Sequence, residues 1–142
     1  MKRFIRIITL ILVFSMCLSL TGQAAKIEPD GIESSAYIDT VGGSISGGGK
    51  ITLSFSIVAT GLMTEVGAAT IYIKNYSNDA TVASYTYTST SGMMGYNRSS
   101  YSGTITFRNG VTGQKYYAVV YFRSRNSSGA GTVKYTSGYA TY

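Results

Sequence analysis

The chain has 142 residues, with 12 Lys and Arg against 6 Asp and Glu, one Pro, one Cys, and neither His nor Trp. Without an imidazole, it lacks a histidine general base, a Ser-His or Cys-His nucleophile pair and a histidine-ligated metal, which carry much of the chemistry of small enzymes. We therefore expect a protein that is not an enzyme and that needs no cofactor.

Residues 1–24 have the pattern of a secretory signal-peptide helix. Three basic residues stand within the first six positions, an apolar run follows at 7–20, and small residues occupy positions 22 and 24. The run is shorter than the roughly 20 residues that cross a bilayer. We expect cleavage between Ala24 and Ala25 and release of the mature chain without a membrane anchor. The alternative is an uncleaved N-terminal anchor.

The segment 25–34 predicts a flexible N-terminal arm. It contains Glu28, Asp30 and Glu33, the main acidic cluster of the sequence. Carboxylates at this spacing could hold Ca²⁺, but the ligand and glycine spacing of a defined calcium loop is missing. We expect a solvated arm and no metal site. The single cysteine, Cys17, lies in the signal peptide, so the mature chain has no disulfide or thiolate.

The mature chain has nine basic residues against six acidic ones, because the signal peptide contains three of the 12 cations. These cations are scattered along the chain, whereas nucleic-acid binders cluster them. We expect no nucleic-acid partner. The length that remains is enough for one domain, which we place at 35–142.

Alternation of apolar and polar residues with period two predicts strands along the whole domain. The clearest strand is 50–60, in which Ile51, Leu53, Phe55 and Ile57 share the face that should be buried. Residues 61–67 and 89–102 read as connections. In chain order, the predicted strands are 35–40, 50–60, 69–76, 81–88, 103–107, 115–125 and 132–139.

This spacing is typical of an all-β, antiparallel, about seven-stranded β-sandwich of immunoglobulin-like or fibronectin-III-like type. An up-and-down barrel is the alternative. The segment from Gly113 to Phe122 resembles the sixth strand of fibronectin-III domains. The resemblance implies that Tyr116 forms a tyrosine corner, with its hydroxyl bonded to the backbone upstream.

Three methionines, Met63, Met93 and Met94, fall in predicted loops. Such residues either form a hydrophobic surface for a partner or plug the open ends of a sandwich. We expect the second role.

The chain also resembles, over nearly all of its mature length, a family of small secreted proteins of unknown function from Gram-positive bacteria. The resemblance implies location and fold and transfers no catalytic residue. The matching residues are Lys50 to Phe55, Gly61-Leu62-Met63, Val66-Gly67-Ala68, Gly92-Met93-Met94 with Asn97, and Gly113 with Tyr116 and Ala118.

A candidate ligand-binding face follows from the sandwich, in which the third, sixth and seventh strands are neighbours. Tyrosine rings can contact sugars or proteins, and Arg and Lys attract phosphate or carboxylate. The alternative is a structural face, in which cross-strand tyrosine pairs stabilise the sheet and cations keep it soluble. The outward residues are Tyr72, Lys74, Tyr117, Tyr121, Arg123, Arg125 and Lys134.

Together these features predict a secreted, non-enzymatic binding or adhesion module at or near the bacterial cell envelope. Its ligand would be an anionic wall polymer, a glycan or a protein. The alternative is a structural or self-associating exported protein, because Tyr-, Ser- and Gly-rich edge strands can pair between chains.

Overall fold

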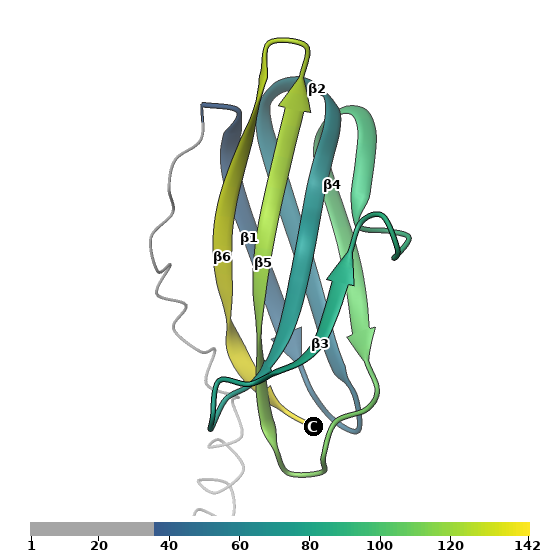
Figure 1. The fold of residues 1–142 in the computed structure, drawn as a ribbon, viewed down its shortest axis with the longest axis vertical. Helices are drawn as coiled ribbons and strands as arrows, with labels where there is room; N and C mark the ends of the chain where they lie inside the picture. Colours follow the sequence, from purple (N-terminus) through teal and green to yellow (C-terminus); the bar gives the residue numbers. More distant parts are fainter. Residues whose placement is uncertain (1–35) are drawn as a thin grey trace, which may run out of the picture.

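The computed structural model describes residues 36–142, which form six antiparallel strands (Figure 1). The predicted signal peptide, the N-terminal arm and the acidic cluster at 28–33 lie outside the described residues. The strands are β1 (Ile38–Ser46), β2 (Ile51–Asn75), β3 (Thr81–Thr86), β4 (Met94–Phe107), β5 (Lys115–Asn126) and β6 (Gly129–Thr141).

The predicted all-β antiparallel class is confirmed, with six strands where the sequence indicated about seven. The difference arises in β2, which joins the predicted strands 50–60 and 69–76 into one. The segment between them stays extended because Met63 pairs with Arg98, and Glu65 with Tyr96, across β4. Cross-strand pairing thus overrides the weak strand propensity of a glycine-containing segment.

The strand β4 is also longer than predicted, because most of the expected loop 89–102 belongs to it. Its Ser, Asn and Gly residues are typical of loops, yet its two halves pair with the two halves of β2. The register shifts between Val58 and Met63, where β2 arches over at the top of Figure 1. Both strands therefore pass from one layer of the fold to the other.

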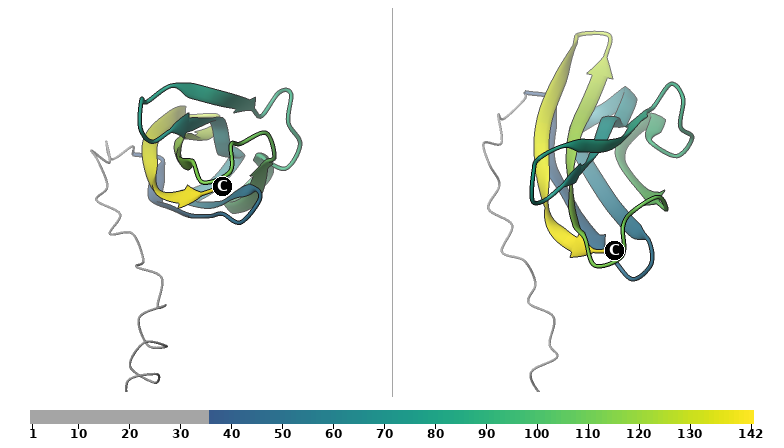
Figure 2. Two further views of the ribbon diagram at one scale, coloured as in Figure 1. Left: turned by 90° about the horizontal axis from the view of Figure 1, so that it is seen from below. Right: turned by 60° about the horizontal axis from the view of Figure 1, so that its bottom comes forward.

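Two layers face each other across a shared interior, which Figure 2 shows enclosed by the strands. The first layer contains β1, the first half of β2 and the second half of β4. The second layer contains β6, β5 and the second half of β2, with β3 and the first half of β4 along the other edge of β2. This second layer carries every residue of the predicted binding face.

The core lies between the layers and follows the predicted alternation. In the first layer, Leu53, Phe55 and Ile57 are buried. The opposing buried residues of β5 include Val120 and Phe122, and the Phe55 and Phe122 ring centroids lie 6.1 Å apart. The buried faces predicted for these two strands, β2 and β5, are therefore confirmed.

Two of the three methionines pack into the interior, and Met63 and Met94 lie in strands where loops were expected, so the expected plugging of open ends stays a prediction. Met63 and Met93 are buried, and Met94 is half-buried. The carbonyl oxygen of Met93 accepts a hydrogen bond of 2.8 Å from the amide of Ala68, which holds the β3–β4 loop against β2. Met63 and Met93 are therefore part of the core, whereas Met94 keeps part of its surface exposed.

The predicted bond of Tyr116 is present. Its hydroxyl oxygen accepts a hydrogen bond of 3.0 Å from the amide of Val111, five residues upstream. The ring is buried and packs against Phe107 at a centroid distance of 5.6 Å. This local arrangement fastens the β4–β5 loop, while the immunoglobulin-like assignment of the whole domain stays a prediction.

Candidate functional site

The structure brings all seven residues of the predicted face onto the outer side of the second layer. They come from β2, β5 and β6, which are neighbours. Lys74 lies opposite Tyr117, and Tyr121 lies opposite Lys134. We call this side of the molecule, with its other outward side chains, the outer face of β2, β5 and β6. Whether it binds a ligand stays a prediction.

A hollow of about 230 Å³ lies in the middle of this face. Its floor includes Val119, an outward residue of β5 that is nonetheless only 7% exposed. The Tyr72 and Tyr121 rings stand perpendicular to each other beside it, at a centroid distance of 6.1 Å. The hollow thus combines an apolar floor, aromatic edges and the side chains of two lysines. Its lining residues are Tyr72, Lys74, Thr81, Val119, Tyr121 and Lys134.

Sequence reasoning found four of these six residues and missed Thr81 and Val119. Val119 stands outward in the alternation of β5, so the pattern alone places it in water. It is covered because Tyr72, its partner on β2, and Tyr121 flank it with large side chains. Thr81 reaches the hollow only because β3 folds back along β2.

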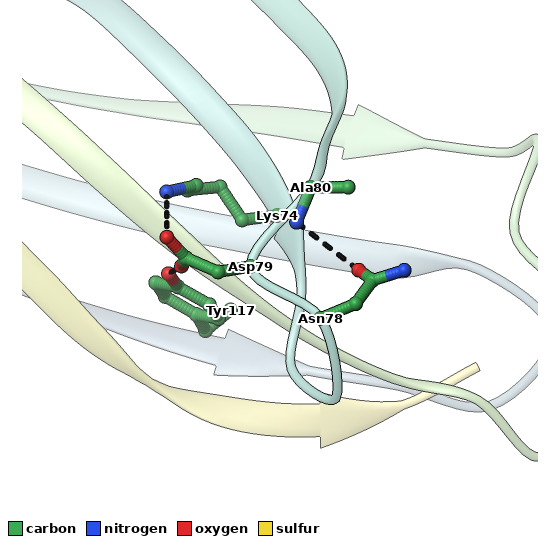
Figure 3. Close-up of polar contacts among 5 residues, drawn as sticks. All are labelled: Lys74, Asn78, Asp79, Ala80 and Tyr117. Atoms are coloured by element: carbon green, nitrogen blue, oxygen red, sulfur yellow. Dashed lines mark hydrogen bonds and ion pairs between the residues drawn. The ribbon is translucent and has the colours of Figure 1, made fainter.

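The carboxylate of Asp79 binds two members of the face (Figure 3). The ammonium of Lys74 lies 2.8 Å from Asp79 Oδ2, and the Tyr117 hydroxyl donates to Asp79 Oδ1. The same ammonium is 5.8 Å from the Tyr117 ring centroid, within the range of a cation–π contact. Asp79 closes the β2–β3 turn at φ 60°, a conformation that Asp and Asn tolerate. Lys74 and Tyr117 are therefore already engaged within the protein.

A second acidic side chain neutralises one arginine of the face. Arg123 Nη2 lies 3.5 Å from Glu65 Oε2, an oxygen that is buried and accepts no hydrogen bond among the described residues. The Glu65 side chain is 22% exposed, so the attraction is only partly screened by water. Like Lys74, Arg123 has a structural partner of its own.

Three cations on the face remain without an ion pair among residues 36–142. These are Lys115, Arg125 and Lys134, and all three are exposed. The same residues include eight basic and three acidic side chains, of which Glu65 and Asp79 are the two engaged on this face. The face consequently carries net positive charge.

A cluster of tyrosines at one end of the face was missed by sequence reasoning. The Tyr76 and Tyr139 ring centroids lie 4.9 Å apart, and Tyr76 stands perpendicular to Tyr117 at 6.4 Å. The Lys115 ammonium lies 4.5 Å from the centroid of Tyr139. Tyr76 reads as a turn residue in the sequence, and only the pairing of Tyr117 with Tyr139 reveals the cluster.

The outer side of the first layer differs in chemistry. There β1, the first half of β2 and the second half of β4 present rows of hydroxyl groups around a shallow depression of about 480 Å³. No charged side chain interrupts these rows. Positive charge and tyrosine rings are thus concentrated on the second layer. The hydroxyl residues are Ser44, Ser46, Thr52, Ser54, Ser56, Ser102, Thr104 and Thr106.

No protein-family model matches the sequence, and no curated protein matches it significantly. The family resemblance inferred from the residues therefore stays a prediction. Within residues 36–142, no group of three His, Cys, Asp or Glu side chains could hold a metal ion. No helix in this part of the chain is long and apolar enough to cross a membrane.

Proposed function

We propose that the chain is a secreted, non-enzymatic binding module of the bacterial cell envelope that holds an anionic partner on the outer face of β2, β5 and β6. One observation carries the proposal: exposed cations without ion pairs surround tyrosine rings and a hollow on a single face. Such a face attracts phosphate or carboxylate from a distance and offers flat contact area on arrival. An anionic wall polymer has the required charge.

The alternative of a purely structural face accounts for part of the arrangement. Asp79 and Glu65 engage Lys74, Tyr117 and Arg123 inside the protein. It leaves Arg125 and Lys134, which contact no acidic side chain among the described residues, only the role of keeping the sheet soluble. These two cations are therefore the residues on which to test binding.

The test measures retention of the purified protein on immobilised poly(glycerol phosphate). We expect the double variant Arg125→Ser with Lys134→Ser to lose at least about tenfold in affinity, since each cation adds favourable electrostatic energy. The parent's retention should weaken as salt rises towards a screening length of about 8 Å. The melting temperature should stay close to that of the parent, because both side chains are exposed.

The matched control is Lys50→Ser with Arg108→Ser, which removes the same charge at two exposed positions outside the face. It should retain most of the binding. Equal losses in both double variants would show that net charge, and not this face, causes retention, and would contradict the proposal.

A second candidate function, self-association, is supported by β3. Within residues 36–142, this strand pairs with β2 alone; it carries no charged residue, and its Val82 is 43% exposed. Edge strands without charges are prone to pair with another chain. Sedimentation of the parent should then show concentration-dependent oligomers that Val82→Lys abolishes. A monomer at all concentrations would exclude this function.

A further inference from the structure

A groove of about 420 Å³ lies at the end of the face, between the β2–β3 turn and the β4–β5 loop. Small-molecule sites commonly have volumes in this range, about 300–1,000 Å³. Tyr76, which is 55% exposed, contributes to one wall. The lining residues are Tyr76, Ser77, Thr112, Gly113, Gln114 and Lys115.

The two walls of the groove are joined to each other. The side-chain Nε2 of Gln114 donates to Asn75 Oδ1 at 3.0 Å, and the same oxygen accepts hydrogen bonds from the backbone amide and the hydroxyl of Ser77. The Tyr76 amide donates to the Lys115 carbonyl oxygen at 3.0 Å. The turn and the loop are thus fixed before any ligand arrives, which reduces the entropy lost on binding.

The Tyr76 ring is held in place from the protein side. Tyr139 lies 4.9 Å away and Tyr117 packs edge-on at 6.4 Å, so the ring has neighbours that restrict its rotation. Its exposed side is a rigid aromatic surface, of the kind that dominates binding energy at interfaces. An aromatic ring presents negative charge density on its face, which favours contact with the polarised C–H groups of a sugar ring.

The polar groups of the groove suit the same ligand. The Thr112 hydroxyl can donate and accept, as sugar hydroxyls do, and the Ser77 hydroxyl, which donates its hydrogen to Asn75 Oδ1, can accept one more hydrogen bond. Lys115 places one positive charge beside Tyr76 and has no ion pair among the described residues. A neutral sugar leaves this charge unused, whereas a carboxylated sugar pairs with it.

We propose that this groove binds one acidic sugar residue of a glycan chain, with its ring against Tyr76 and its carboxylate at Lys115. The inference rests on the proposed function and narrows it, because it names the class of anionic ligand at one end of the same face. The remaining cations along the face would then contact further acidic sugars of the chain.

Three polymers separate the parts of this proposal. Polygalacturonate has both sugar rings and carboxylates, polyphosphate has charge without rings, and dextran has rings without charge. By calorimetry or affinity electrophoresis, we expect the parent to bind polygalacturonate most tightly. Tyr76→Ala should weaken polygalacturonate binding about tenfold, whereas Tyr76→Phe, which keeps the ring, should stay within about twofold. Lys115→Gln should weaken polygalacturonate binding and leave dextran unchanged.

Two controls keep the test specific. Tyr96 is 56% exposed and pairs with Glu65, a residue of β2 that precedes Tyr76 by eleven positions, so Tyr96→Ala should bind as the parent does. Polyphosphate binding should be insensitive to Tyr76→Ala. Normal polygalacturonate binding by Tyr76→Ala, or an equal loss for polyphosphate, would overturn the inference while leaving the proposed function intact. If the parent binds neither polygalacturonate nor polyphosphate, both the inference and the proposed function are overturned.

Discussion

The hydroxyl of Tyr135 on β6 donates a hydrogen bond of 2.8 Å to the carbonyl oxygen of Gly43 on β1. It joins two strands that are far apart in the sequence and that lie beside each other where the two layers meet. Glycine is required at position 43, because a Cβ atom there would lie 2.8 Å from the carbonyl oxygen of Ser54 and 3.2 Å from the Tyr135 ring. This contact brings the first layer against the second.

Alkaline pH should destabilise the protein through this tyrosine. Burial raises the pKa of the Tyr135 hydroxyl above 10.0, and burial acts in the same direction on the pKa of Tyr85. In the unfolded chain these groups ionise near pH 10, so above that pH the unfolded state binds fewer protons and the free energy of unfolding falls. Below about pH 10 their contribution is fully present.

Tyr135→Phe tests this by denaturant unfolding at neutral pH and above pH 10. The variant should lose about 0.5–1.5 kcal/mol at neutral pH, the net value of a typical hydrogen bond. Its further loss at high pH should be smaller than that of the parent. Tyr96→Phe alters an exposed ring and serves as the control. Parallel pH profiles for Tyr135→Phe and the parent would refute the role of Tyr135.

Phe55→Ala should destabilise the core by about 3–5 kcal/mol, since the ring is 2% exposed and contacts Phe122 across the layers. Its neighbour Ser56 points outward, so Ser56→Ala should change the free energy of unfolding by less than about 0.5 kcal/mol. Chemical denaturation of both variants measures the difference. A larger loss for Ser56→Ala would mean that the faces of β2 are assigned the wrong way round.

Gly67→Ala should also be destabilising, although the change adds only a methyl group. A Cβ atom at this position would lie 2.3 Å from the carbonyl oxygen of Met93, which accepts the amide of Ala68. Relief of that clash should cost about 1–3 kcal/mol. Gly61→Ala is the matched control, because no atom lies within 4 Å of its added Cβ. Equal melting temperatures for the two variants would contradict the close approach of the β3–β4 loop.

Asp79→Asn should strengthen the binding of polyanions. The substitution frees the Lys74 ammonium from its 2.8 Å ion pair and removes one negative charge from the face, while Asn tolerates the positive φ of the turn. Stability should fall by no more than about 1 kcal/mol, because the Asp79 side chain is 70% exposed. Retention on poly(glycerol phosphate) at low salt provides the measurement. Weaker retention would indicate that Asp79 positions a binding residue.

The sequence by itself determined the strand class, the buried faces and seven of the residues on the outer face of β2, β5 and β6. Period-two alternation is a local property, so Leu53, Phe55, Val120 and Phe122 could be assigned to the core without knowledge of their neighbours. The same periodicity placed Tyr121 and Lys134 outward, and the neighbouring strands of a sandwich then brought them together.

Only the tertiary structure decided where β2 and β4 continue and which outward residues are engaged. Residues 61–67 and 94–102 have weak strand propensity and become strand because each pairs with the other strand. The bonds of Asp79 to Lys74 and Tyr117, and the tilted ring contact of Tyr76 with Tyr139, join residues from a turn and from other strands. Such contacts depend on the register between strands, which the pattern of one strand does not contain.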